Sequence, residues 1–188
     1  MSTWQSYIKE YQNYLRLERG LSKNTIENYT FDIEKLVLFL HQHDIADSPI
    51  TITEETIQQF IYEISSKVNA RSQSRVISGL KSFFNYLVFE DYRKETPLEL
   101  IEVPKTGRKL PDTLATEEID ALISAIDLST PEGERNRAML ETLYSCGLRV
   151  SELVGLKISD LFFEEGFIKI TGKGNKQRFV PVGGSTIK

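Results

Sequence analysis

The sequence predicts a mostly α-helical protein that carries one small β-sheet near its C-terminal end. In the first half of the chain, apolar side chains recur at the spacing of amphipathic helices. Beyond residue 165 the period changes to two, which is typical of strands. Between these parts lies a proline-containing stretch without any period, and we expect the chain to divide there. The expected organisation is a helical bundle over residues 1–95, a linker over 96–111 and a second unit over 112–188.

Four amphipathic helices with short connections make up the expected bundle. Gly20 can end the first helix in a left-handed conformation, and Ser22 and Thr53 can cap the second and third. Apolar residues three and four positions apart give each helix one buried face. The faces comprise, in chain order, Trp4, Tyr7, Ile8, Tyr11, Tyr14 and Leu15; Ile26, Tyr29, Ile33, Leu36, Val37 and Leu40; Ile57, Phe60, Ile61 and Ile64; and Val76, Ile77, Leu80, Phe83, Phe84, Leu87 and Val88.

The second unit is expected to contain three helices followed by a β-hairpin. Thr116 is the expected N-cap of the first helix, and Thr130 followed by Pro131 predicts the start of the second. That helix ends near Gly147, and a short helix runs from about residue 150 to 156. The expected strands are Phe167 to Thr171 and Arg178 to Val182, joined by the turn Gly172-Lys173-Gly174-Asn175-Lys176.

Composition by itself does not support a nucleic-acid partner. The net charge is -4 and the pI is about 5.4, whereas nucleic-acid binders usually carry a basic surface. Residues up to Pro104 contain 11 Lys+Arg against 15 Asp+Glu, and the remaining residues contain 12 against 12. Only locally clustered positive charge could therefore serve such a partner. A single cysteine, Cys146, fits a reducing cytoplasm, and no apolar run is long enough to span a membrane.

The first candidate site is the segment Gly147-Leu148-Arg149-Val150-Ser151-Glu152-Leu153. Arg149 follows a glycine break, at the expected start of a short helix. A helix N-terminus favours anions, and a guanidinium beside it can hold a phosphate through two hydrogen bonds. Glu152, three residues later, can reach the same side of the helix. On spacing alone, an ordinary surface pair of Arg149 and Glu152 remains the simpler interpretation.

The second candidate site is the turn of the expected hairpin. Lys173 lies between Gly172 and Gly174, and such small neighbours allow a ligand to approach closely. Lys176 and Arg178 add positive charge, which gives a compact basic finger suited to a nucleic-acid groove or backbone. A solvated charged turn remains the alternative, and the spacing of a Walker phosphate loop is absent.

Together these two segments resemble the two conserved boxes in the first half of the catalytic domain of Xer-type site-specific tyrosine recombinases, which belong to the phage integrase family. The G-L-R-x-S-E-L box and the G-K-G-N-K-x-R-x-V-P hairpin occur in that family in this order and at this separation. Residues 21–29 and 71–80 likewise resemble the start of the second helix and the fourth helix of the family's core-binding domain.

This resemblance implies a fold and a reaction. A four-helix core-binding (SAM-like) bundle would precede the first part of an α+β catalytic domain, and the two would clamp a DNA duplex from opposite faces. A tyrosine of the parent protein would attack the scissile phosphate, form a 3′-phosphotyrosyl link and free a 5′-hydroxyl. Arg149 would stabilise charge on the non-bridging oxygens, Lys173 would act as the general acid, and Glu152 would support the site.

The resemblance also implies partners. The expected partner is a double-stranded DNA recombination site, and the full-length parent would assemble as a tetramer on two duplexes, with chromosome dimer resolution as its role. Neither a cofactor nor a metal is expected, because fixed cations supply the electrostatic stabilisation. Contacts with DNA are expected from eight residues: Ser22, Asn24, Thr25, Tyr29, Arg71, Arg75, Lys176 and Arg178.

Several motifs of that family should follow the hairpin, namely a His-x-x-Arg pair, a later His or Trp and the nucleophilic tyrosine. None is found in the 188 residues. His41 and His43, the only histidines, are expected to lie at the surface of the bundle without binding metal, and Cys146 is expected to fill the core. We therefore expect a C-terminally truncated chain that binds DNA and cannot cleave it.

Two other functions remain open on the sequence. A natural truncation could serve as a non-catalytic DNA-binding or regulatory protein that occupies recombination sites. A helical protein-interaction module without any DNA role would agree with the acidic pI. The residues do not identify the target DNA, nor do they distinguish a chromosomal Xer recombinase from a mobile-element integrase.

Overall fold

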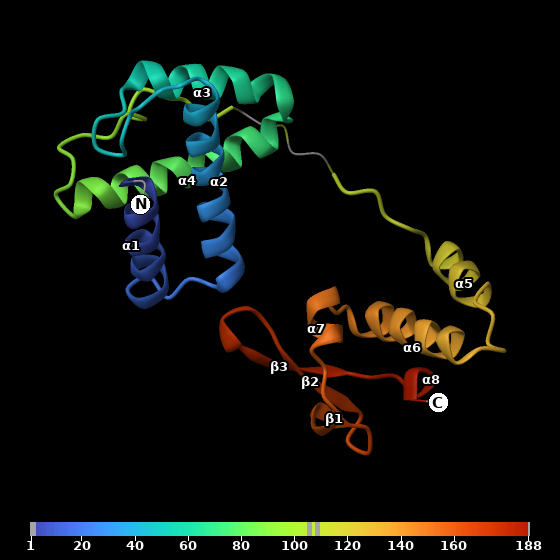
Figure 1. Ribbon diagram of the computed structural model, residues 1–188. Coiled ribbons are helices and arrows are strands. Elements are labelled where there is room, and N and C mark those ends of the chain that lie inside the picture. Colours follow the sequence, from blue (N-terminus) through green and yellow to red (C-terminus); the bar gives the residue numbers. More distant parts are fainter. Residues whose placement is uncertain (1–2, 105–106, 108–109, 188) are drawn as a thin grey trace. The chain divides into compact units, whose positions relative to one another are not determined.

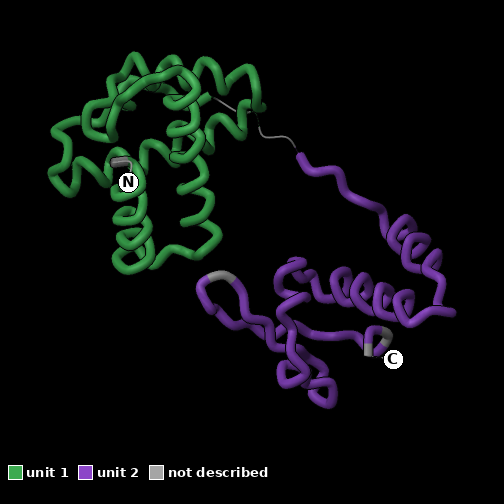
Figure 2. The backbone as a smooth tube through the Cα atoms, viewed as in Figure 1, with its two compact units in different colours: residues 1–109 green, residues 110–188 purple. Residues whose placement is uncertain are grey.

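The computed structural model of the protein describes residues 3–104, 107 and 110–187, except for the side chains of Thr3, Lys173, Ser185 and Ile187. The chain forms two compact units, Met1–Lys109 and Leu110–Lys188 (Figure 2). The described part of the first unit is helical, and the second unit combines helices with a three-stranded sheet (Figure 1). The predicted fold class, mostly α with a small β-sheet, is confirmed.

The described residues of the first unit form four helices, and three of these begin at polar capping residues. As predicted, the hydroxyls of Ser22 and Thr53 accept hydrogen bonds from backbone N–H groups three residues later. The side chain of Asn69 caps the fourth helix in the same way. Gly20 has a φ of +58°, the left-handed conformation that a side chain would strain. The helices are α1 (Thr3–Leu17), α2 (Lys23–Gln42), α3 (Glu54–Lys67) and α4 (Ala70–Phe89).

Aromatic side chains of α1 and α4 form much of the core of the first unit. Tyr11 and Phe83 are completely buried, and the Tyr11 hydroxyl donates a 2.7 Å hydrogen bond to Ser82. Trp4 stacks on Phe83 with ring centroids 6.2 Å apart. Its indole N–H donates to the carbonyl of Asp47 at 2.8 Å. The buried aromatic residues therefore also have partners for their polar atoms, as burial requires.

Packing in the first unit continues past residue 95, although the linker is expected to start at residue 96. Leu98 and Ile101 are buried in the same hydrophobic cluster as the helices. The ammonium of Lys81 donates to the carbonyl of Ile101 at 2.7 Å, and the hydroxyl of Ser74 donates to that of Pro104 at 3.1 Å. Both donors belong to α4, so this helix binds the segment from Ile101 to Pro104 through hydrogen bonds. Linker positions 105–106 and 108–109 lie outside the described residues.

A buried carboxylate lies where α2 packs against α4. The side chain of Asp32 is 0% exposed and accepts hydrogen bonds from Arg75 at 2.6 Å and from Lys35 at 3.5 Å. A Cβ atom on Gly79 would lie 3.0 Å from the Asp32 carboxylate, so this glycine provides the space for it. Burial raises the pKa of Asp32, against the attraction of the two cations.

The second unit begins with two helices, α5 (Thr116–Ser124) and α6 (Pro131–Cys146). The predicted N-cap at Thr116 is wrong: Ala115 is the cap, because the Glu118 carboxylate accepts a 2.7 Å hydrogen bond from its backbone N–H. Thr130 caps α6 as predicted, with its hydroxyl 3.1 Å from the N–H of Gly133. The next elements are α7 (Val150–Val154) and η1 (Ile158–Asp160), and the last is α8 (Gly184–Ile187).

An antiparallel sheet with the strand order β1-β2-β3 completes the second unit. Ile168 and Ile170 are buried on one face of β2, and they pack with Cys146 and Leu148. The first strand has only two residues and therefore shows no alternation from which to predict it. The strands are β1 (Leu161–Phe162), β2 (Phe167–Thr171) and β3 (Gln177–Pro181), with the turn η2 (Lys173–Asn175) between the last two.

Among the helices in the described part of the chain, none combines the length and the apolar character that crossing a bilayer requires.

The first prediction concerns the buried pair of Asp32 and Arg75. Removing one partner of a fully buried pair costs about 3–5 kcal/mol. Because Arg75 is partly exposed, we expect Arg75→Gln to lower the free energy of unfolding of the first unit by about 2 kcal/mol. The loss should shrink at acidic pH, where protonation neutralises Asp32.

Urea unfolding followed by tryptophan fluorescence checks this prediction, since Trp4 is the single tryptophan and lies in the core of the first unit. Arg71→Gln, one turn earlier on α4, is the matched control. The described residues offer Arg71 no ion pair, so the change should stay within about 0.5 kcal/mol. Equal losses in the two variants would contradict the structural role of Arg75.

Candidate functional site

The candidate site of the second unit is organised around the carboxylate of Glu152. This residue lies in the first turn of α7, and its side chain is only 3% exposed. One oxygen accepts a 2.9 Å hydrogen bond from the backbone N–H of Arg149, the residue that precedes the helix. The other accepts a 3.0 Å hydrogen bond from the Arg149 guanidinium. Glu152 therefore both caps the helix and orients the arginine.

A second arginine approaches the same carboxylate from the sheet. Nη1 and Nη2 of Arg178 donate to the two oxygens of Glu152 at 2.7 Å and 2.9 Å. In the register of β2 and β3, Arg178 pairs with Ile170, so the two side chains share the buried face of the sheet. A Cβ atom on Gly172 would lie 3.2 Å from the Glu152 carboxylate, so the absence of a side chain there keeps the approach open.

These contacts determine the ionisation of Glu152. The hydrogen bonds from Arg178, together with the backbone N–H of Arg149, lower the pKa of Glu152 to about 2, although burial acts in the opposite direction. The same hydrogen bonds raise the pKa of Arg178. The carboxylate is therefore ionised at neutral pH and holds two positive side chains together.

Arg149 and Arg178 differ in what they offer to an external ligand. The side chain of Arg149 is 75% exposed, and one of its nitrogens binds Glu152. Its position before α7 places it beside the backbone N–H groups of a helix start. An exposed guanidinium at such a position can bind an anion such as a phosphate. Arg178 is 41% exposed, and both of its terminal nitrogens are bound to Glu152.

The predicted hairpin is present, and Lys173 is the first residue of its turn, η2. The side chain of Lys173 lies outside the described residues, so its predicted role stays a prediction. Gly174 and Asn175 follow with φ values of +72° and +59°, which shape a tight turn. Lys176 is exposed after the turn, as a basic finger would require.

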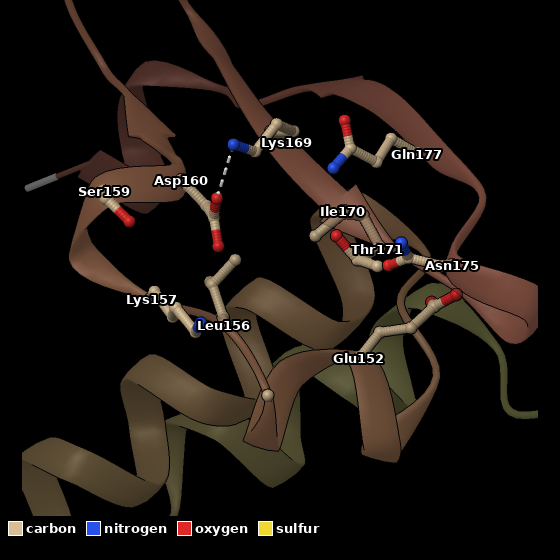
Figure 3. Close-up of a pocket in the computed structure, with 11 residues that line it drawn as sticks. Glu152, Leu156, Lys157, Ser159, Asp160, Lys169, Ile170, Thr171, Asn175 and Gln177 are labelled. Carbon is tan, nitrogen blue, oxygen red and sulfur yellow. Dashed lines mark ion pairs between the residues drawn. The ribbon is translucent and has the colours of Figure 1, made fainter.

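A polar cavity of about 530 Å³ borders this cluster (Figure 3). Glu152 lies at one end of it. The ion pair of Lys169 and Asp160, 2.9 Å long, lies at another part of the lining, and Asn175 and Gln177 come from the hairpin. The cavity thus brings the start of α7 and the hairpin next to one solvent-accessible space.

The residues of the first unit that are expected to contact DNA have different surroundings. Ser22 caps α2 and also contacts the Thr25 hydroxyl at 2.9 Å. Asn24 and Arg71 are exposed. Tyr29 packs partly against the core. Arg75 is bound to the buried Asp32, as described above, so its guanidinium has a structural partner.

Glu152 was expected to support the site, but the predictions missed the buried Asp32 and the pairing of Glu152 with Arg178, although the sequence carried signals for both. Asp32 lies three residues after Tyr29 and four before Leu36, so it falls on the apolar face of α2. Arg178 lies two residues before Val180, on the inward side of an alternating strand. A charged residue on a buried face indicates a buried partner, and this rule would have pointed to Asp32 with Arg75 and to Glu152 with Arg178.

The remaining reactive residues belong to the first unit or make none of the contacts of Glu152. His43 ends α2 and lies 2.7 Å from a carboxylate oxygen of Glu63, and His41 is exposed. Cys146 is buried in the core of the second unit, as expected. Tyr144, the only tyrosine after residue 92, is half-exposed on α6. Within the described residues, no three His, Cys, Asp or Glu side chains are grouped as a metal site would require.

Comparison with known families matches both parts of the chain to phage integrase domains. Residues 8–91 match the N-terminal SAM-like domain of phage integrases. Residues 112–188 match the phage integrase family. The two matches cover separate parts of the chain, one in each compact unit.

Curated relatives agree with this assignment. The chain is 39% identical over 185 residues to the tyrosine recombinase XerD of Staphylococcus haemolyticus, covering 98% of this chain and 62% of the relative. It is 41% identical to XerD of Staphylococcus saprophyticus, covering 96% of this chain and 61% of that relative. It is 35% identical to XerD of Halalkalibacterium halodurans, covering 97% and 62%. The chain therefore spans about three fifths of the length of these relatives.

Solved structures share the fold. A lambda integrase tetramer bound to a Holliday junction matches with a TM-score of 0.72 at 21% identity, over 94% of this chain and 50% of that one. The XerH recombinase bound to a palindromic difH substrate matches with a TM-score of 0.67 at 22% identity, over 96% and 55%. The sequence matches and the shared fold agree: the chain belongs to the phage integrase family, and its sequence is similar to those of Xer-type tyrosine recombinases.

Proposed function

We propose that this chain binds a double-stranded DNA recombination site, and that the whole protein recombines DNA by cutting and rejoining strands through a 3′-phosphotyrosyl intermediate. The single observation that carries the proposal is the exposed guanidinium of Arg149, held at a helix start by the buried carboxylate of Glu152. A phosphate is the anion that this arrangement suits, and the relatives are named as tyrosine recombinases.

Three residues have proposed roles at the phosphate. Arg149 binds the non-bridging oxygens and stabilises the charge that develops on them. Lys173, in the hairpin turn, donates a proton to the leaving 5′-oxygen. Glu152 acts on Arg149 and does not touch the DNA, because its carboxylate is buried. No metal or cofactor has a role in this proposal, since the positive side chains supply the charge.

The proposed organisation follows the two family domains. Residues 1–95 form the core-binding unit and residues 112–188 form the first part of the catalytic unit. The whole protein assembles as a tetramer on two DNA duplexes in the cytoplasm, where it resolves chromosome dimers. Outside the phosphate site, the proposed DNA contacts are Ser22, Asn24, Thr25, Tyr29, Arg71 and Lys176.

The first test is DNA binding in a salt series. The chain should bind a palindrome-like recombination site at low salt with a dissociation constant on the order of micromolar, and the affinity should fall steeply as salt rises. Arg149→Gln should reduce the slope of log K against log salt by about 0.9, the loss of one phosphate contact. Fluorescence anisotropy of labelled DNA measures both quantities.

Arg135→Gln is the control for this test, because Arg135 is an exposed arginine of α6 in the same unit and the change in charge is identical. The slope of log K against log salt for Arg135→Gln should equal that of the unmodified chain. Absence of any binding at low salt would contradict the proposal and favour a helical protein-interaction module.

The second test concerns strand cleavage. None of the tyrosines of these 188 residues occupies the position that the family nucleophile takes after the hairpin. A nicked suicide substrate, which traps the covalent intermediate, should therefore give no protein–DNA adduct on a denaturing gel. An adduct that persisted in detergent would show that a residue of this chain attacks the phosphate.

The third test concerns the proposed supporting role of Glu152. Its pKa is about 2 in the folded chain against an ordinary value of 4.5. The ionised carboxylate therefore stabilises the second unit above about pH 4.5, and this contribution disappears as the pH falls toward 2. Glu152→Gln should lower the melting temperature at pH 7 and have little effect near pH 2. NMR of the β2 amides during heating measures it, and a difference independent of pH would contradict the role.

A further inference from the structure

Arg178 has two possible roles, and the geometry separates them. As a basic residue of the hairpin, it is expected to contact DNA. In the structure its two terminal nitrogens are bound to the two oxygens of Glu152, at 2.7 Å and 2.9 Å. That carboxylate is 3% exposed. Although the side chain is 41% exposed, these two bonds fix the orientation of the guanidinium and direct one donor of each terminal nitrogen to the buried carboxylate.

We propose that Arg178 is a positioning residue, which orients Arg149 through Glu152 and thereby ties the β2–β3 hairpin to the start of α7. This inference rests on the proposed function for its consequence in catalysis. The link joins the two segments that carry the proposed catalytic cations, since Arg149 precedes α7 and Lys173 begins the turn before β3.

The chemistry of the link requires an arginine. Glu152 receives four hydrogen bonds, two from Arg149 and two from Arg178. A planar guanidinium matches the two carboxylate oxygens at once, whereas a lysine ammonium is a single point charge. Without Arg178, the buried carboxylate would keep only Arg149 as its partner. It would then compete more strongly with phosphate for that guanidinium.

The surroundings of the link restrict its position. Gly172 leaves just enough space beside the carboxylate, since a Cβ atom there would lie 3.2 Å from Glu152 and 3.6 Å from the Arg178 guanidinium. The N–H of Gly172 donates a 2.7 Å hydrogen bond to the carbonyl of Lys176, which closes the base of the turn. The base of the turn that contains Lys173 is therefore closed beside the Glu152 carboxylate.

The experiment uses the 188-residue chain and two readouts. The first is the NMR signal of the Arg149 side-chain Nε–H without DNA, assigned with Arg149→Gln. The second is the affinity for a recombination site in a salt series. The variants are Arg178→Gln, Arg178→Lys, Glu152→Gln and the double variant Glu152→Gln with Arg178→Gln. Lys176→Gln, in the same hairpin, is the charge-matched control for Arg178→Gln.

Positioning predicts a shift of the Arg149 signal in Arg178→Gln, a partial return in Arg178→Lys and no shift in Lys176→Gln. Arg178→Gln should weaken DNA binding about tenfold, or about 1.4 kcal/mol, without changing the salt slope, whereas Lys176→Gln should reduce the slope by about 0.9. Glu152→Gln should also weaken binding about tenfold. In the double variant the DNA affinity should fall about tenfold and not about a hundredfold, because both residues act through the same carboxylate.

The opposite outcome overturns the inference. If Arg178→Gln reduces the salt slope by about 0.9 and leaves the Arg149 signal unchanged, Arg178 is a DNA ligand and the proposed function stands. If the unmodified chain binds no DNA, the proposed function fails, yet the Arg149 signal still tests the link. If Arg178→Gln unfolds the second unit, the Arg149 signal and the DNA affinity are compared in Arg178→Lys and in the double variant instead. The double variant leaves no buried charge without a partner.

Discussion

A buried carboxylate bound by arginines is the interaction on which the second unit depends. An ionised carboxylate is costly to remove from water unless hydrogen bonds replace those it loses. Glu152 recovers these hydrogen bonds from Arg149, three residues earlier in the chain, and from Arg178 on β3. Its burial therefore requires the helix start and the hairpin to be correctly placed at the same time. The hydrophobic cluster beneath it is small, so this polar link contributes much of the geometry of the unit.

The first unit uses the same arrangement in a different setting. Asp32 is buried where α2 meets α4, and Arg75 and Lys35 bind it. There the pair lies beside a large aromatic core, so it adds specificity to a packing that apolar burial already favours. The net charge of the chain is negative, and in both units carboxylates hold arginines that composition alone would assign to a nucleic-acid surface. Positive charge available to a partner is thus smaller than the count of basic residues suggests.

Local patterns predicted most of the fold. Helical periodicity identified the four helices of the bundle, and Ser22, Thr53 and Thr130 cap helices as expected, because these signals act within a few residues. Ala115 replaced Thr116 as a cap because a glutamate side chain, which spacing alone does not orient, reaches back to it. The strand β1 depends on pairing with β2 and has no pattern of its own. The partners of Arg75 and Arg178 are distant in sequence, so their ion pairs could be found only by asking what a charged residue does on a buried face.

The residues that follow the bundle have a consequence for how the two units act together. Lys81 and Ser74 hold the carbonyls of Ile101 and Pro104 on α4, and Leu98 and Ile101 are buried beneath. Residues up to Pro104 therefore belong to the packing of the first unit, although the linker was expected to start at residue 96. When one of two linked modules binds, a shorter tether that still spans the sites keeps the other at a higher effective concentration near its target. Two hydrogen bonds from one helix thus shorten the connection between the units, which would raise that effective concentration.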